Sequence, residues 1–377
     1  MQRWDAIIVG AGPAGCAAAW DLASAGYTAL LLDRADFPRP KACAGGLTRK
    51  SLRALRYSVA PVVRETVSSL VVESRSGETA TLVSRTAVCA MTVRQELDAF
   101  CLRQTRAAGA EFQRIGPILT IEENDREVML RTAERSFCGQ FLIGADGVHS
   151  RVRQFVHGEA VPWFRRGFAL EAQVYPAVGN DSDLVFDLAP VQHGYGWIFP
   201  KGDHLNVGLY IDSEEEKLDR SRLSRYIGER FSGARAGAVT GQFLGFGAGN
   251  APTIRTRIFL VGDAGGFADP LTGEGIHGAI ASGQAAAAAI QADLKGRQPA
   301  WRSFAALTDP LRRDLRLSDS GARWFYGNPD PGFRALTSPL FRGAVINAYA
   351  NGTKIAALAN AIRRFARAFT SASTVSR

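Results

Sequence analysis

A glycine-rich segment near the start of the chain has the residue types needed to hold a phosphate. Gly10, Gly12 and Gly15 form a G-x-G-x-x-G pattern, with Ala14 before the last glycine, directly after the apolar segment Trp4–Val9. Such glycines allow a tight turn, the approach of the backbone to a pyrophosphate, and close packing of a helix on a sheet. A helix that begins here directs its partial positive charge at the phosphate. We therefore expect these four residues to bind the phosphates of a dinucleotide.

Asp33 stands about 20 residues farther on, at the end of the apolar segment Thr28–Asp33. A carboxylate at the end of a second strand accepts hydrogen bonds from ribose hydroxyls and disfavours a 2′-phosphate. This position argues against NADP as the bound nucleotide. We expect the neighbouring Arg34 to lie on or near the adenine, and the alternative is an ordinary surface arginine.

The residues around these motifs predict the elements that position them. The segments Trp4–Val9 and Thr28–Asp33 are typical of buried strands, and the small-residue segment Ala17–Ala25 between them is typical of a helix. Together they predict one βαβ unit. Farther along, Gln95–Gly109 predicts an amphipathic helix and Phe141–Ala145 another buried strand.

The pattern changes between about residues 168 and 246, where apolar and polar residues alternate. Such alternation is typical of an antiparallel sheet with one face exposed to water. The strands expected there are Ala169–Val174, Asp183–Leu188, Tyr195–Pro200 and Leu205–Ile211, broken by a polar helix near Leu218–Phe231. The following residues predict a strand at Ile258–Gly262, an Ala-rich helix at Gly275–Leu294, and then helices interrupted at Asn328–Gly332.

Two further segments give the glycine turn a family context. Phe141–Arg153, which contains Asp146, resembles the Asp-Gly motif of flavoprotein hydroxylases and their reductase relatives, and Arg257–Ala264 resembles their Gly-Asp motif. The resemblance implies FAD as cofactor, with a helix after the second motif whose dipole stabilises negative charge on the reduced flavin. The cofactor-binding residues that it implies here are Asp146, Gly262, Asp263, Pro270, Gly273, Gly275 and Ile276. Arg94, at the start of a predicted helix, fits the family position of a cofactor-binding arginine, the alternative being an ordinary helix-start arginine.

One loop narrows the resemblance to the geranylgeranyl reductase branch. Pro38–Leu47 is similar to the K-P-C-G-G-G loop of that branch, although Ala42 and Ala44 replace the usual Pro and Gly. In the family this loop lies next to the flavin ring and the substrate, which implies that Cys43, Ala44 and Gly45 contact one or the other. For Cys43 we consider a catalytic role, such as a weak proton donor, and the alternative of a small buried hydrophobic residue.

A second segment, Gly194–Pro200, resembles the P-x-x-Y-x-W-x-F-P signature of the same branch, with Gln192 in place of the first Pro. Tyr195, Trp197 and Phe199 alternate along one strand and therefore face the same side. They could wall an elongated apolar cavity above the flavin, and ordinary sheet packing is the alternative. We add Tyr195 and Trp197 to the catalytic candidates, together with His277, which begins the last predicted flavin helix and could approach the isoalloxazine.

The resemblance covers residues 1 to about 295 and implies reduction of isolated C=C bonds in isoprenoid chains by hydride from the flavin, with a proton from the opposite side. A second G-x-G-x-x-G is missing, so electrons would come from transiently bound NAD(P)H or a ferredoxin-like carrier. The first alternative is a monooxygenase that hydroxylates an aromatic substrate or a tryptophan of a partner protein. The second is a flavin-bound assembly protein without turnover. Halogenation is disfavoured, because none of the six lysines stands in the family context of a halogenase lysine.

The expected fold is α/β, with a Rossmann-type FAD-binding domain similar to that of p-hydroxybenzoate hydroxylase. We assign residues 1–60, 85–165 and 250–297 to this discontinuous domain. Residues 61–84 and 166–249 would form a substrate-binding β-sheet domain, and residues 298–377 a C-terminal helical region.

Composition agrees with a cytoplasmic enzyme. The chain has 377 residues, of which 46% are hydrophobic, and we find neither a signal peptide nor a membrane-spanning segment in it. Its five cysteines show no CxxC pairing, which predicts free thiols and no metal site. Nothing in the sequence indicates a nucleic-acid partner.

The positive charge is concentrated in the last part of the chain. From residue 301 to 377 twelve basic residues face four acidic ones, a net charge of +8 out of +9 for the whole chain. In Lys354–Phe369, the apolar residues Leu358, Ile362, Phe365 and Phe369 recur at helical spacing. Such a stripe either packs on the protein itself or lies on an anionic membrane, so peripheral contact with the inner membrane face is one hypothesis.

Overall fold

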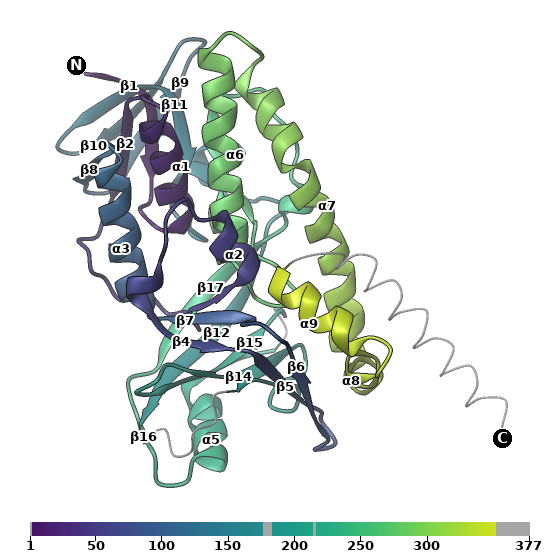
Figure 1. Ribbon diagram of the computed structural model, residues 1–377. Helices are drawn as coiled ribbons and strands as arrows, with labels where there is room; N and C mark the ends of the chain where they lie inside the picture. The colour runs from purple at the N-terminus through teal and green to yellow at the C-terminus, as the bar shows by residue number, and fades with distance from the viewer. Residues whose placement is uncertain (1, 176–182, 214–215, 352–377) are drawn as a thin grey trace, which may run out of the picture.

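A computed structural model describes residues 2–175, 183–213 and 216–351 (Figure 1). The apolar stripe of Lys354–Phe369 lies outside the described residues. Within the described ranges, no helix combines the length and the hydropathy needed to cross a membrane. The fold has two main sheets, with helices beside both of them (Figure 1).

The first sheet has parallel strands at its centre, as the βαβ pattern predicts. Its strands lie in the order β8–β2–β1–β11, and β18 pairs with the end of β11. These parallel strands are β1 (Arg3–Val9), β2 (Ala29–Asp33), β8 (Glu111–Arg114), β11 (Ser136–Gly144) and β18 (Ile258–Leu260). The antiparallel strands β9 (Ile118–Glu123) and β10 (Val128–Thr132) extend the sheet from the first half of β11.

Three helices cover one face of this sheet: α1 (Pro13–Ser24), α3 (Arg94–Ala107) and α6 (Ile276–Leu294). Helices α1 and α6 come very close because both are rich in small residues. A side-chain carbon added at Gly283 would lie 2.2 Å from the Ala14 carbonyl oxygen, which leaves no room for any other residue there. On the opposite face, Ile7 and Leu30 pack with Val128 and Leu130 of β10 and with Val152 of α4 (Arg151–His157).

The second sheet carries the aromatic segment in its middle. Its order is β12–β15–β14–β13–β5–β6, with β16 and β17 both paired to β12. The strands are β5 (Ser69–Glu73), β6 (Thr79–Val83), β12 (Arg165–Tyr175), β13 (Leu184–Asp187), β14 (Gly194–Pro200), β15 (Leu205–Ile211), β16 (Arg235–Ala236) and β17 (Thr240–Phe246). All pairs are antiparallel except that of β13 with β5.

The prediction that this sheet has one wet face is wrong for its central strands. Every residue of β14 and β15 is buried. Helix α5 (Arg220–Arg230) covers the outer face, and its Leu223 and Ile227 pack with Ile198 and Val207 of the sheet. The helix was expected from the sequence, but its polar composition gave no sign that it would cover the sheet.

A small third sheet joins the two larger ones. It contains β3 (Gly46–Thr48), β7 (Cys89–Thr92) and β4 (Val63–Val67), and α2 (Arg49–Ala54) follows β3. Short 3₁₀ turns lie at Ala60–Val62 (η1), Ala248–Asn250 (η2) and Gly262–Gly265 (η3). Strand β3 thus leads directly out of the Pro38–Leu47 loop.

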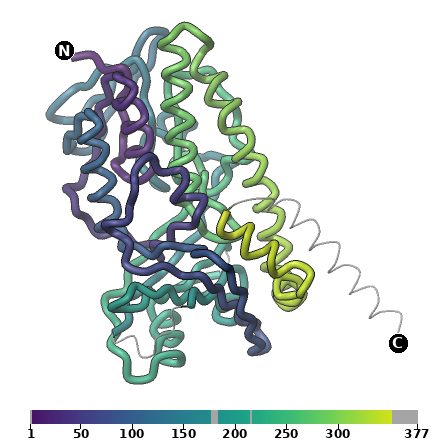
Figure 2. Tube along the Cα trace, viewed as in Figure 1, coloured from purple at the N-terminus to yellow at the C-terminus, as the bar shows by residue number. Residues whose placement is uncertain are grey.

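The C-terminal helices run along both sheets (Figure 2). They are α7 (Ala300–Gly327), α8 (Pro329–Thr337) and α9 (Arg342–Asn351). The expected interruption is confirmed, because α7 ends at Gly327 and a new helix starts at Pro329. The break is only one residue long, since proline is tolerated in the first turn of a helix.

Candidate functional site

The glycine turn lies between β1 and α1 and has one open position. A side-chain carbon added at Gly10, which has a positive φ of 104°, would lie 2.3 Å from the Ala145 carbonyl oxygen. One added at Gly15 would lie 1.8 Å from the Gly10 carbonyl oxygen. At Gly12 the nearest atom is Nη2 of Arg39, 3.9 Å away. The turn is therefore tightly packed below and open above Gly12, where a phosphate group would approach the backbone.

Asp33 braces this turn from the end of β2. Its Oδ2 accepts a hydrogen bond of 2.7 Å from the Ala11 amide, and its Oδ1 accepts one of 2.9 Å from the Ala35 amide. Each carboxylate oxygen has a second lone pair, which leaves capacity for a ribose hydroxyl. The side chain of Arg34 is exposed beside it, and its contact with the adenine stays a prediction.

The Gly-Asp motif meets the glycine turn at the end of the same sheet. The amide of Gly262 donates to the Ser282 hydroxyl at 2.9 Å, and a side-chain carbon on Gly262 would lie 3.1 Å from that of Ala14. One added at Gly275 would lie 3.3 Å from Oδ1 of Asp263, so this carboxylate lies beside the start of α6. Burial raises the pKa of Asp263, whereas nearby Lys41 favours its charged form.

Asp146 is placed by the structure in a helix cap. Its Oδ1 accepts a hydrogen bond of 2.6 Å from the Ser150 hydroxyl, and its Oδ2 accepts one of 2.7 Å from the Arg151 amide at the start of α4. Burial raises the pKa of this carboxyl, and these bonds oppose the rise. Its side chain is thus engaged with the protein, and its contact with the cofactor stays a prediction.

Arg94 opens α3 and binds a carboxylate through two of its guanidinium nitrogens. Its Nε and Nη2 donate to Oδ1 and Oδ2 of Asp98 at 2.7 and 2.9 Å. Although burial disfavours the charge, Asp98 and Cys43 raise the pKa of Arg94 above its ordinary value. Asp98 also lies 3.3 Å from Nη2 of Arg39, which connects α3 with the loop before β3.

Two buried charged residues bind the loop Pro38–Leu47, which we call the Cys43 loop. The Cys43 amide donates to Oε1 of Glu171 at 2.9 Å, and the Gly45 amide donates to the Cys43 sulfur at 3.3 Å. The ammonium of Lys201 donates to the carbonyl of Ala44 and, at 3.1 Å, to that of Thr92. Burial lowers the pKa of Lys201 to about 8, although Cys43 and other neighbouring groups favour its charge.

Glu171 and Lys201 were not singled out from the sequence. Glu171 lies in the middle of an apolar strand, and burial raises its pKa. Lys201 directly follows the aromatic segment and is 3% exposed. The available signals were a charged residue inside a strand for Glu171 and a charged residue directly after a strand for Lys201, but the burial of both depends on how the two sheets meet.

The three aromatic side chains of β14 lie in one buried cluster. Tyr195 donates to the Thr272 carbonyl, and Trp197 donates through Nε1 to Oδ1 of Asn206 at 2.7 Å. The ring of Phe199 comes within 3.2 Å of a side-chain carbon added at Gly46, in the Cys43 loop. The cluster therefore reaches both the loop before α6 and the Cys43 loop, but its role as a cavity wall stays a prediction.

His277 lies in the first turn of α6, after Ile276. Its amide donates to Oε1 of Glu274 at 2.6 Å, and the same carboxylate is paired with Lys50 at 3.0 Å. Burial and the nearby Lys50 lower the pKa of the His277 ring, so that the neutral form dominates at pH 7. Pro270 and Gly273 form the loop that precedes this helix.

Comparison with known proteins shows which family combines these turns. Residues 3–183 match a family model described as an FAD binding domain. An uncharacterized protein of Methanosarcina barkeri is 30% identical over 93% of this chain and 91% of its own length. A digeranylgeranylglycerophospholipid reductase of Methanococcoides burtonii is 30% identical over 80% of each chain. The chain belongs to the geranylgeranyl reductase family. A geranylgeranyl diphosphate reductase of Rhodobacter capsulatus is 29% identical over 79% of this chain and 78% of its own.

Solved structures share the fold. A geranylgeranyl bacteriochlorophyll reductase-like protein from Thermoplasma acidophilum has a TM-score of 0.80 at 20% identity, covering 96% of this chain and 99% of its own. A flavin-dependent brominase has a TM-score of 0.75 at 18% identity, covering 97% of this chain and all of its own. At such identities the likeness concerns the fold alone.

As a member of the geranylgeranyl reductase family, the protein is an FAD-dependent oxidoreductase. The residues present fit this cofactor. The glycine turn, Asp33, Asp263 and the start of α6 all follow the carboxyl ends of parallel strands, where open α/β sheets bind their ligands. The space above Gly12 has the position that the pyrophosphate needs at the start of α1.

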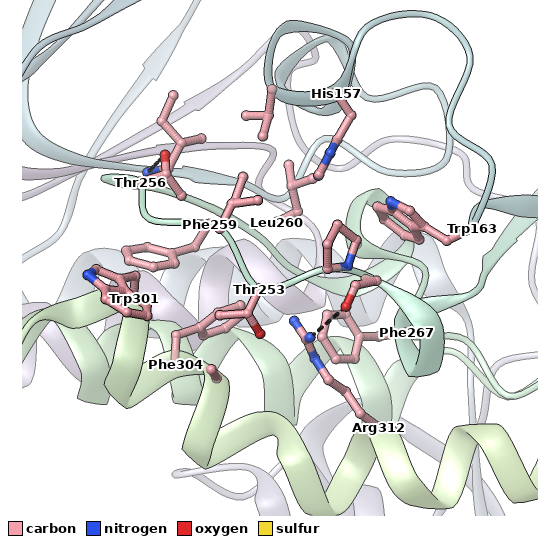
Figure 3. A pocket seen from close by; sticks show the side chains of 17 residues that line it. His157, Trp163, Thr253, Thr256, Phe259, Leu260, Phe267, Trp301, Phe304 and Arg312 are labelled. Carbon is pink, nitrogen blue, oxygen red and sulfur yellow. Dashed lines mark hydrogen bonds between the residues drawn. The ribbon is translucent and has the colours of Figure 1, made fainter.

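A pocket lies between α4, β18, the 251–257 segment and α7, and Gly265 of η3 also lines it (Figure 3). Its wall combines the aromatic residues Trp163, Trp301 and Phe304 with Arg312, whose Nη1 donates to the Ala251 carbonyl at 3.1 Å. The pocket contains none of the predicted site residues. In the described part of the chain, no group of three or more His, Cys, Asp or Glu side chains is arranged to hold a metal ion.

Proposed function

We propose that this FAD-dependent oxidoreductase reduces isolated C=C bonds in an isoprenoid or similarly apolar substrate. The observation that carries the proposal is the contact between the Cys43 loop and the aromatic strand. Phe199 packs against Gly46, and Tyr195 reaches the loop before α6. A long apolar chain lying on this strand would have its double bond beside both loops expected to border the flavin.

Bound FAD would supply the electrons for the reduction. The chain's own residues would bind and orient it: the glycine turn and α1 at the pyrophosphate, Asp33 at the ribose, and Asp263 and the start of α6 at the flavin end. The buried aromatic cluster would exclude water from the reacting carbon atoms, which favours reduction of the substrate over side reactions.

The proton could come from Cys43. Its sulfur accepts a hydrogen bond from the Gly45 amide, so that the thiol proton remains free to point elsewhere. Burial raises the pKa of Glu171. This carboxyl group accepts a hydrogen bond from the Cys43 amide and would keep the loop in place. NAD(P)H or a ferredoxin-like protein would reduce the flavin between turnovers.

The relatives support this substrate class. Those named above include a geranylgeranyl diphosphate reductase and a digeranylgeranylglycerophospholipid reductase, both named for geranylgeranyl compounds. The monooxygenase alternative has support only at the level of fold.

The test is an anaerobic half-reaction. The flavin is photoreduced under argon and mixed with a geranylgeranyl lipid, with the fully saturated lipid of equal length as a control. We expect the unsaturated lipid alone to reoxidise the flavin and to gain two hydrogens, as measured by mass spectrometry. Reoxidation by oxygen with hydroxylation of an added aromatic compound, and none by the lipid, would overturn the proposal in favour of a monooxygenase.

A further inference from the structure

The loop before α6 is held by three tyrosine hydroxyls, each on a different carbonyl. Tyr210 donates to the carbonyl of Pro270 at 3.1 Å. Tyr326 donates to that of Leu271 and Tyr195 to that of Thr272, each at 2.5 Å. Three consecutive carbonyls of the loop are therefore bonded on one side by hydroxyls from β15, α7 and β14.

Asp269 holds the same loop from the other side. Its Oδ1 accepts hydrogen bonds from the amides of Leu271 at 2.9 Å and Thr272 at 3.2 Å. The Ser318 hydroxyl of α7 donates to the same oxygen at 2.6 Å. The Gly273 amide donates to the Asp269 carbonyl at 2.8 Å. With both the carbonyls and the amides engaged, the peptide planes between residues 270 and 273 have little freedom to rotate.

The three hydroxyls keep the protons that they donate to these carbonyls. All three tyrosines are buried, and burial raises their pKa well above the ordinary value, so that they stay protonated. A carbonyl that loses its tyrosine partner loses a hydrogen-bond donor beside a largely apolar cluster. The bond to the Pro270 carbonyl is buried, and those to the carbonyls of Leu271 and Thr272 are partly buried.

The loop leads directly to the start of α6. A side-chain carbon on Gly273, which has a positive φ of 64°, would lie 3.0 Å from the Tyr195 hydroxyl. Two residues later, Gly275 lies against Asp263. The orientation of the α6 amides toward the flavin thus depends on a loop whose peptide planes the tyrosines fix.

We propose that Tyr195, Tyr210 and Tyr326 are positioning residues that aim the N-terminus of α6 at the flavin through the Pro270–Gly273 loop. Tyr326 extends this role to α7, outside the region expected to bind FAD. The proposal deepens the proposed function, since it concerns the same flavin site. It requires FAD but no particular substrate, so its test does not depend on alkene reduction.

The experiment compares Tyr326→Phe and Tyr210→Phe with the wild-type holoprotein. Each change removes one hydroxyl and keeps the ring. Tyr226→Phe is the control, because Tyr226 is also buried but belongs to α5 on the outer face of the sheet, away from the loop before α6. The readouts are the two-electron reduction potential of bound FAD, from anaerobic titration with a reference dye, and the unfolding midpoint in urea.

A looser α6 start should destabilise the reduced flavin more than the oxidised flavin, relative to the wild type. We therefore expect a lower reduction potential in both loop variants. A fivefold larger loss of affinity for reduced than for oxidised FAD corresponds to about 20 mV. The control should keep the wild-type potential. Loop variants that lose stability but keep the wild-type potential would overturn the proposal, because the tyrosines would then be structural only.

Discussion

The buried ammonium of Lys201 makes a quantitative prediction. A lysine whose pKa falls from its ordinary 10.5 to about 8 in the folded protein is destabilising while it stays charged. The difference corresponds to roughly 3 kcal/mol, at about 1.4 kcal/mol for each pH unit. Lys201→Met keeps most of the length of the side chain and removes the charge.

The direction of the pH effect follows from proton counting. Below pH 8 both the folded and the unfolded states hold the Lys201 proton, and the full penalty is present. Between about pH 8 and 10.5 the unfolded state still holds a proton that the folded state has lost, so the free energy of unfolding rises with pH. From pH 7 to pH 9 the Lys201 contribution should improve by roughly 1 kcal/mol, and from pH 7 to pH 10 by roughly 2 to 3 kcal/mol.

Urea unfolding at saturating FAD, followed for the wild type and for Lys201→Met at pH 7, 9 and 10, measures this contribution. Only the difference between the two proteins matters, because all other titrating groups are shared. Loss of the bonds to the Ala44 and Thr92 carbonyls shifts the variant by an amount nearly independent of pH. Lys217→Met, which removes an exposed lysine, is the control for the loss of one charge. Parallel pH curves for the wild type and Lys201→Met would refute the buried, pKa-shifted ammonium.

Three further predictions concern the cofactor and the aromatic strand. Gly12→Val should fill the open space above the glycine turn and abolish stoichiometric FAD in the purified protein, measured by the absorbance ratio of flavin to protein. Full FAD content would show that the phosphate lies elsewhere. Asp263→Ala should weaken FAD binding by roughly 5- to 150-fold, or about 1–3 kcal/mol, in a fluorescence titration of the apoprotein. An unchanged dissociation constant would mean that this carboxylate does not contact the cofactor. Trp197→Ala should impair turnover or substrate binding while the flavin spectrum stays nearly the same, whereas wild-type kinetics or simple unfolding would favour ordinary packing.

Much of the fold could be predicted from the sequence, because short-range patterns determine it. The βαβ unit, the strands Tyr195–Pro200 and Leu205–Ile211 and the helix after Gly275 all carry their own periodicity or glycine signals. The structure has these strands and the helix after Gly275 within a residue of the expected bounds, whereas α1 starts at Pro13, four residues before the expected Ala17. The three motifs could be placed for the same reason, since each is a continuous run of residues at the end of a strand.

Long-range packing could not be predicted in this way. The coverage of the second sheet by α5 depends on Leu223 and Ile227 meeting strands in a different part of the chain. The burial of Glu171 and Lys201 arises only when the middle of β12 and the end of β14 meet the Cys43 loop. Strand β5 pairs in parallel with β13, more than a hundred residues later, and no local signal marks such a partner.

Helix α7 changes how the C-terminal region relates to the cofactor site. The sequence suggested a separate helical region from residue 298, with only loose similarity to the family. In the structure, Ser318 and Tyr326 of α7 bind the loop before α6, and Arg312 and Arg316 bind the carbonyls of Ala251 and Gly249. A helix that holds both the loop before the flavin helix and the segment before β18 is part of the framework of the site.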